Sequence, residues 1–181
     1  YGNFTNAGTF NQSGKLEIED GGSSLNHNIT STSTLTNLHI NKSGGGTIGI
    51  TDSSLQINSV VINNSNFLFK VYNGRKLVLP NGINMSAGTF QLDGGGTIEI
   101  GSGQNLNVTG ALFLVAGTND SFPQNSSTKG LIQPVGGSGT WGLNASSGRI
   151  SFSGFHFSKM NTSGLNVTGS TIITQLRGGQ F

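Results

Sequence analysis

Apolar side chains spaced two residues apart are the feature of this sequence that most limits its fold. The pattern occurs in Leu16-Glu17-Ile18, Ile48-Gly49-Ile50, Leu77-Val78-Leu79, Ile98-Glu99-Ile100 and Ile150-Ser151-Phe152. A period of two places both apolar side chains on one face of a β-strand. No window long enough for a helix shows apolar residues at a period near 3.6. The 30 glycines disfavour helices further, since each costs about 1 kcal/mol at a helical site. The sequence therefore predicts an all-β protein with essentially no helix.

Low charge and frequent glycine do not indicate a disordered chain here. Hydrophobic residues make up 33% of the sequence and alternate with polar ones, whereas disordered segments are poor in hydrophobic residues and rich in charge. Gly-Gly, Asn-Gly and Ser-Gly pairs separate the strand-like segments and predict turns. There is no cysteine, which excludes a disulfide scaffold.

The charge pattern limits the partners. The net charge is +2, and Arg75-Lys76 is the only adjacent pair of basic residues. Nucleic-acid binding needs a stripe of positive charge that displaces counterions from phosphates, so we expect no nucleic-acid partner. No apolar run is long enough to span a bilayer as a helix, so we expect no membrane insertion.

Internal repeats point to a solenoid. Gly44 to Ile50 reappears as Gly94 to Ile100, and Leu106 to Gly110 reappears as Leu165 to Gly169. Three short strands and three turns take about 20–30 residues, which is one coil of a parallel β-helix. We therefore predict that residues 1–181 form a single β-solenoid, or a fragment of a longer one, with about eight irregular coils. The crossover rule for parallel strands favours a right-handed coil.

Two features complicate this prediction. A β-sandwich is the alternative fold, with about seven antiparallel strands and hairpin turns at Asn73-Gly74 and Asn81-Gly82. Residues 117–139 break the strand rhythm, since they hold Phe122-Pro123 and Pro134 with few aliphatic residues. We expect a long loop excursion there, of the kind that is usually functional or disordered.

The acidic residues give little support to catalysis. Glu17, Glu19 and Asp20 form the only acidic cluster, and a glycosidase needs two carboxylates about 5–10 Å apart. A carbohydrate-active β-helix that binds or cleaves a polysaccharide is therefore the alternative function. Asp20 and Asp93 each precede two glycines, as in part of a calcium-binding nonapeptide, but the tandem repeat is missing. Calcium is the only cofactor that the sequence suggests, and turn chemistry explains both motifs more simply.

Aromatic residues are the better candidates for ligand binding. Phe67, Phe69, Phe155 and Phe157 are expected to fill the interior of the solenoid. Trp141 and Tyr72, if exposed, would stack on sugar rings, and Phe122 in the excursion is a third candidate. Such a platform would suit a cell-surface glycan as the partner.

Asparagines in Asn-x-Ser/Thr sequons are candidates for glycosylation. Twelve sequons occur, among them those at Asn28, Asn107 and Asn166 within predicted strands. Strand alternation accounts for much of this number, because Asn and Thr two residues apart share a face. The sequons matter only if the source attaches N-glycans.

Several of these segments resemble a known class of protein. Gly8-Thr9-Phe10, Gly88-Thr89-Phe90 and the two repeated units above resemble the passenger repeats of bacterial surface β-solenoids of the filamentous-haemagglutinin and autotransporter adhesin type. The resemblance covers most of residues 1–110 and 139–176. It implies a secreted or cell-surface protein with a non-enzymatic role as stalk, adhesin or filament building block, and it transfers no catalytic residue. No polar cap is evident at either end of the pattern, so we also expect self-association through the solenoid ends or flanking repeats.

Overall fold

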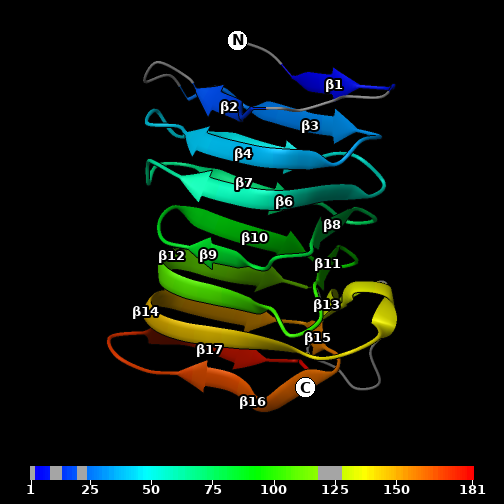
Figure 1. The fold of residues 1–181 in the computed structure, drawn as a ribbon. Helices are drawn as coiled ribbons and strands as arrows, with labels where there is room; N and C mark the ends of the chain where they lie inside the picture. The colour runs from blue at the N-terminus through cyan, green and yellow to red at the C-terminus, as the bar shows by residue number, and fades with distance from the viewer. Residues whose placement is uncertain (1–2, 9–13, 20–23, 118–127) are drawn as a thin grey trace.

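The protein is a column of stacked parallel strands. The computed structural model describes residues 3–8, 14–19, 24–117 and 128–181. In Figure 1 the column runs from β1 at the top to β16 and β17 at the bottom. Every strand pair within the described residues is parallel, as in β3 with β5 and β11 with β13. The predicted parallel β-solenoid is confirmed, and the antiparallel sandwich is wrong. The described residues contain no α-helix, and η2 (Val135–Gly137) is a single 3₁₀ turn.

The strands form two hydrogen-bonded sheets. The ten-stranded sheet contains β1 (Phe4–Asn6), β3 (His27–Ser31), β5 (Thr47–Ile50), β7 (Leu68–Val71), β9 (Ile83–Met85), β10 (Thr89–Asp93), β12 (Asn105–Ala116), β14 (Trp141–Ser153), β16 (Met160–Val167) and β17 (Ile172–Arg177). The seven-stranded sheet contains β2 (Leu16–Glu19), β4 (Leu35–Asn41), β6 (Leu55–Ile62), β8 (Lys76–Leu79), β11 (Thr97–Ile100), β13 (Gly130–Pro134) and β15 (Phe155–Phe157).

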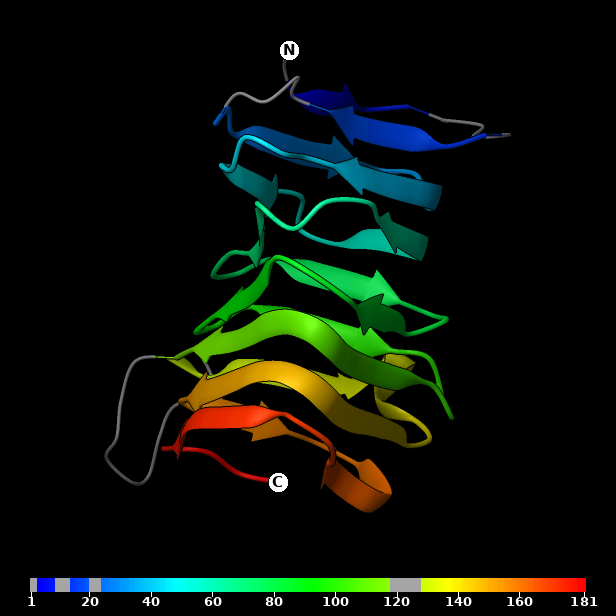
Figure 2. The same ribbon diagram turned by 90° about the vertical axis from the view of Figure 1, so that its left-hand side faces the viewer.

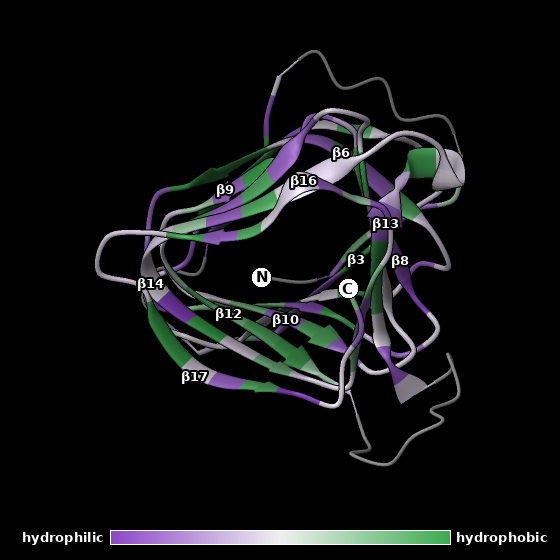
Figure 3. Cartoon of the chain, turned by 90° about the horizontal axis from the view of Figure 1, so that it is seen from below, coloured by the Kyte–Doolittle hydropathy of each residue, from purple (hydrophilic) through white to green (hydrophobic). Residues whose placement is uncertain are grey.

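Each coil has three faces, which Figure 3 shows along the column axis. The first face holds β1, β3, β5, β7, β10, the second halves of β12 and β14, and β17. The second face holds β8, β11, β13 and β15 with the first residues of β6. The third face holds β2, the later residues of β4 and β6, β9, the first halves of β12 and β14, and β16. Figure 2 shows the long strands curving from one face onto the next.

The coil length follows from residues that occupy equivalent positions on the first face. These are Phe4, Ile29, Ile50, Val71, Leu92, Val115, Phe152 and Leu176. Successive differences give coils of 25, 21, 21, 21, 23, 37 and 24 residues. There are thus about seven coils and not eight, because one coil is enlarged. At a strand spacing of about 4.8 Å the column is about 34 Å long.

The core is a set of apolar ladders inside the column. Ile29, Ile50 and Leu92 are fully buried and stack in register on the first face. Phenylalanines dominate the C-terminal half, where the rings of Phe113 and Phe152 meet edge to face at 5.2 Å. The prediction that Phe67, Phe69, Phe155 and Phe157 fill the interior is confirmed, since all four are at most 5% exposed.

Two expectations about local structure need correction. Part of the expected excursion at residues 117–139 is strand β13, because Gly130, Ile132 and Pro134 point inward and pair with the neighbouring coils. Residues 118–127 of that segment, with Phe122, lie outside the described residues. The turns at Asn73-Gly74 and Asn81-Gly82 are not hairpins; they carry the chain from one face to the next, between β7 and β8 and between β8 and β9.

Candidate functional site

The sheet on the third face is interrupted between β6 and β9. β6 pairs with β8 only through Leu55 and Gln56, and β9 pairs with β12 alone. Pro80 stands at this point and has no amide hydrogen to donate. The chain then turns sharply at Gly82, which has φ +71° and donates its amide to the carbonyl of Leu79 at 3.0 Å. The third-face segments of β6 and β9 therefore diverge instead of joining one ladder.

This interruption leaves a groove of about 270 Å³ between two coils, which we call the amide groove. Its lining residues are Asn58, Ser59, Val60, Asn81, Gly82, Ile83, Asn84 and Asn107. Val60 and Ile83 belong to the inward ladder and form the floor. Val60 is only partly buried, whereas its ladder partner Leu38 is fully buried. The amide groove thus combines an apolar floor with a polar rim in which no residue is charged.

The β6 side of the rim is fixed by hydrogen bonds. Asn81 Nδ2 donates to the carbonyl oxygen of Asn58 at 3.1 Å and bridges the two coils. Asn58 Oδ1 accepts from Gln56 Nε2 at 2.9 Å. These two bonds leave Asn58 Nδ2 and Asn81 Oδ1 without a protein partner in the described part of the chain.

The opposite side of the rim begins a ladder of asparagines. Asn84, Asn107, Asn144 and Asn166 occupy equivalent outward positions in four coils. Asn144 Nδ2 donates to Asn107 Oδ1 at 3.1 Å, and Asn166 Nδ2 donates to Asn144 Oδ1 at 3.4 Å. At the groove, Asn84 Oδ1 accepts from the hydroxyl of Thr109 at 2.7 Å. The bonds from Thr109 and Asn144 therefore orient the amides of Asn84 and Asn107 and use their oxygens.

Sequence reasoning did not identify this groove. The sequence marks Asn107 as a sequon, and it gives no reason to group Asn58, Asn81 and Asn84 as a site. The available signal is Pro80-Asn81-Gly82, which ends β8 at the corner where the neighbouring β6 continues from the second face onto the third.

Tyr72 lies on the outer surface of the first face. Its ring occupies the space that a side chain at Gly49 would fill, with Cε2 2.7 Å from the position of a Cβ there. Lys70 Nζ is 4.9 Å from the ring centroid and also pairs with Asp93 at 3.1 Å. The ring is partly exposed beside these charges, and stacking of a sugar on it stays a prediction.

Trp141 is not a surface platform. Its side chain is 0% exposed, its Nε1 donates to the carbonyl of Ser158 at 2.8 Å, and its ring meets Phe157 edge to face at 5.7 Å. Trp141 points inward because it begins β14, in which the alternate residues Trp141, Leu143 and Ala145 all face the core. The third candidate, Phe122, lies outside the described residues.

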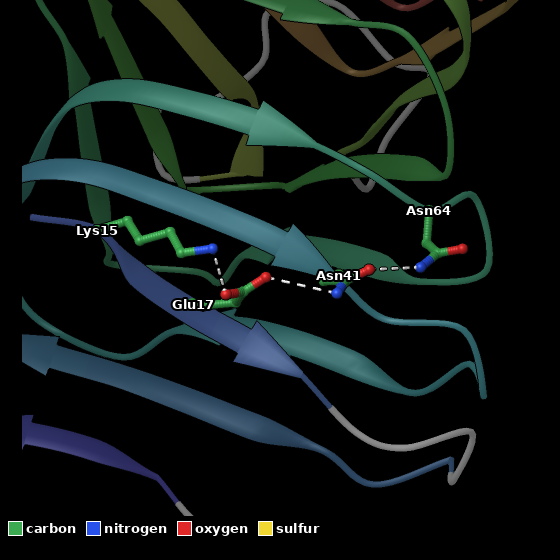
Figure 4. A network of polar contacts seen from close by, with 4 residues as sticks. All are labelled: Lys15, Glu17, Asn41 and Asn64. Atoms are coloured by element: carbon green, nitrogen blue, oxygen red, sulfur yellow. Dashed lines mark hydrogen bonds and ion pairs between the residues drawn. The ribbon is translucent and has the colours of Figure 1, made fainter.

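The expected acidic cluster begins at Glu17 on β2, shown in Figure 4. Lys15 Nζ is 2.6 Å from its Oε2, and Asn41 Nδ2, itself linked to Asn64, donates to Oε1 at 3.4 Å. The hydrogen bond from Lys15 is the main reason that the pKa of Glu17 lies below its ordinary value. Glu19 is exposed, and Asp20 lies outside the described residues. A low pKa suits a permanently ionised structural carboxylate better than a general acid.

Glu99 and Asp93 also have structural contacts. Glu99 Oε2 is 3.5 Å from Lys76 Nζ, and its Oε1 accepts from Gln133 at 3.0 Å. Asp93 accepts from Gln91 at 2.6 Å besides its contact with Lys70. Within the described ranges no three His, Cys, Asp or Glu side chains gather as a metal site. Calcium binding at Asp93 therefore gains no support, and Asp20 lies outside the described residues.

The three selected sequons lie in different surroundings. Asn28 is partly buried on the first face, and its backbone amide donates to Asn3 Oδ1 at 2.9 Å. Asn107 and Asn166 both belong to the asparagine ladder, and Asn166 is exposed on the last third-face strand. The Nδ2 atom of Asn166, to which an N-glycan would be attached, is used within the ladder. Glycosylation at these positions stays a prediction.

The fold and the groove define the chain as a parallel β-solenoid with a neutral polar recess on one face. The chain matches no known family model, no curated protein and no solved structure. In the described part of the chain no helix has the length and apolar character needed to cross a bilayer.

Proposed function

We propose that this chain is a non-enzymatic structural and adhesive segment of a secreted or cell-surface protein, in which a stiff column presents binding surfaces at a distance. The uninterrupted first-face ladder carries this proposal, because it links about seven coils by backbone hydrogen bonds from β1 to β17. A column of this kind resists bending along its axis, since each coil contacts only its neighbours through a continuous sheet.

The surface of the column supports the same role. Outward positions carry amides and hydroxyls in register, such as Thr30 and Thr51 with 2.7 Å between their hydroxyl oxygens. Such residues form hydrogen bonds with one another along the column, and their remaining donor and acceptor atoms can bind neutral partners. Glu17, Asp93 and Glu99 form ion pairs with lysines and act as structural groups, which favours an adhesive role over cleavage of a polysaccharide.

The C-terminal end of the column supports self-association. Ile173 and Leu176 of β17 continue the ladder of Ile150 and Phe152, yet they are 48% and 44% exposed while Ile150 and Phe152 are 0% exposed. Their apolar surface and the edge of β17 are suited to pair with a further parallel strand. We propose that end-to-end contact between copies is the assembly mode of this segment.

A bead assay under flow tests the adhesive role. Beads coated with the purified chain are expected to stay attached to epithelial cells at shear that removes albumin-coated beads. Prior removal of cell-surface glycans with glycosidases should reduce attachment several-fold. Attachment no better than albumin would contradict the adhesive role, whatever the state of assembly.

A further inference from the structure

We propose that the amide groove between β6 and β9 binds one or two residues of a neutral, uncharged saccharide. This inference rests on the proposed adhesive function and assigns it a site. The groove is a defined recess with an apolar floor, a polar rim and unused hydrogen-bonding atoms held in place by protein contacts.

The unused atoms match the hydroxyl groups of a sugar. Asn84 Oδ1 accepts from Thr109 and Asn107 Oδ1 accepts from Asn144, so each of the two asparagines retains an Nδ2 donor that no described residue accepts. Asn58 likewise retains Nδ2, and Asn81 retains Oδ1. A sugar hydroxyl both donates and accepts, so neighbouring amide donors and an acceptor can each engage one.

The floor supplies the second element of sugar recognition. Val60 and Ile83 are ladder residues at the base of the groove, and Val61 beside it is 38% exposed. The C–H face of a pyranose ring is apolar and would cover this surface, while its hydroxyls reach the rim. Small-molecule sites commonly combine apolar walls with a few polar groups that fix orientation.

Size limits the ligand. Typical small-molecule sites enclose about 300–1,000 Å³, and the groove is slightly smaller at about 270 Å³. An inserted β-strand would need β6 and β9 to stand about 9.6 Å apart, twice the strand spacing. At their closest, Cα atoms of β6 and β9 lie within 8 Å of each other, which leaves no room for a strand between them at that point. The groove therefore suits a sugar ring better than an extended peptide.

The absence of charged lining residues limits the ligand further. No lining residue carries a charge, so the groove offers no cation for a sialic acid or a sulfated sugar. Anionic ligands bind where Arg or Lys can form charge-assisted hydrogen bonds. A neutral hexose or N-acetylhexosamine is the class that these groups fit.

Isosteric substitution gives a sharp test. Asn84→Asp with Asn107→Asp removes both free Nδ2 donors but keeps the oxygens that accept from Thr109 and Asn144. Asn73→Asp, in an exposed turn, is the control for an added carboxylate. Circular dichroism melts of all variants check that they fold.

The measurement is a ¹H–¹⁵N NMR titration with galactose, mannose, N-acetylglucosamine, lactose and chitobiose. At about 10 mM sugar, ten times a Kd of about 1 mM, we expect shifts of the Asn58, Asn81, Asn84 and Asn107 side-chain amides with at least one sugar. The folded double variant should bind that sugar at least tenfold more weakly, and the control should bind as the wild type does.

Three results would overturn the site: no shift with any sugar, shifts confined to residues outside the groove such as Tyr72, or unchanged affinity in the folded double variant. The bead assay separates this failure from that of the proposed function. Wild-type beads that adhere while the groove binds no sugar contradict the site alone. Sugar binding at the groove without bead adhesion supports the site and contradicts the adhesive role.

Discussion

Inward residues carry the stability of each coil, as Ile48 illustrates. Ile48 is 0% exposed and lies in register between His27 and Phe69. We expect Ile48→Asp to prevent folding, because an unpaired buried charge costs several kcal/mol against a total stability of about 5–15 kcal/mol. Far-UV circular dichroism measures whether the variant contains β-structure, and urea unfolding measures whether it unfolds cooperatively. Thr47→Asp, one residue earlier and outward, should fold normally, and a cooperative urea transition in Ile48→Asp would contradict the register.

Glycine is required where two coils touch through their backbones. A Cβ at Gly101 would overlap the carbonyl oxygen of Pro80 in the adjacent coil, and neither group can move without separating β8 from β11. We expect Gly101→Ala to lower the free energy of unfolding by about 2 kcal/mol or more, the range for overpacking. Gly14→Ala is the control, since nothing lies within 4 Å of its Cβ position. Equal urea midpoints for the two variants would contradict this contact.

His156 gives the fold a weak dependence on pH. Partial burial, with the nearby charge of Lys129, lowers its pKa below the ordinary 6.5. The unfolded chain then binds more protons at this position, so the stability is complete above pH 6.5 and declines as the pH falls below it. We expect the wild-type urea midpoint to fall between pH 8 and pH 5.5, and His156→Gln to fall less. Identical pH profiles would exclude His156 as the cause.

At the scale of elements, β14 places the single tryptophan in the core. Because Trp141 is fully buried and is the only Trp in the chain, fluorescence reports on this coil alone. We expect weak quenching by acrylamide in the native protein and a red shift on unfolding. Trp141→Phe should cost about 1–3 kcal/mol, since the Ser158 carbonyl loses its buried donor. Efficient quenching of the native protein would restore Trp141 as a surface candidate.

The elements show what sequence reasoning can recover. Alternation of apolar residues identified strands correctly, because every face of a solenoid uses the same period of two. For the same reason the pattern does not say which face a strand occupies. Gly44 to Ile50 leads into β5 on the first face, whereas Gly94 to Ile100 leads into β11 on the second. The repeat suggested a solenoid correctly, yet its period of fifty residues is no multiple of a coil.

The number of coils between two repeated motifs can be counted only once the register of strand pairing is known. Leu106 pairs with Leu143, which pairs with Leu165, so the two Leu-Asn-Val-Thr-Gly units are two coils apart. The candidate site was missed for a related reason. Its residues come from β6, β9, β12 and the turn between β8 and β9, which meet only after the coils stack. Its local signal at Pro80 is equally typical of any turn.

At the scale of the whole molecule, the proposed end-to-end pairing would place the C-terminal end of one column against the N-terminal end of another. The C-terminal end exposes Ile173 and Leu176, and the continuation of their ladder in a second copy would begin at Phe4. Charge agrees in sign through Glu19, which is exposed near the N-terminal end where Lys15 already pairs with Glu17, and through Lys159 and Arg177 near the C-terminal end. Apolar contact supplies the free energy of such pairing, and the charges favour head-to-tail orientation at low salt.

Sedimentation velocity across a concentration series tests this assembly. We expect the wild type to form species that grow with concentration, and the double substitution Ile173→Asp and Leu176→Asp to sediment as a monomer, because two exposed carboxylates block a dry contact between ladders. Both residues are exposed in the single column, so the variant should retain the wild-type melting transition. Thr168→Asp with Ser170→Asp adds the same charge to the exposed turn between β16 and β17 and should still associate. A wild type that stays monomeric at every concentration, or a ladder variant that associates as the turn variant does, would contradict end-to-end pairing.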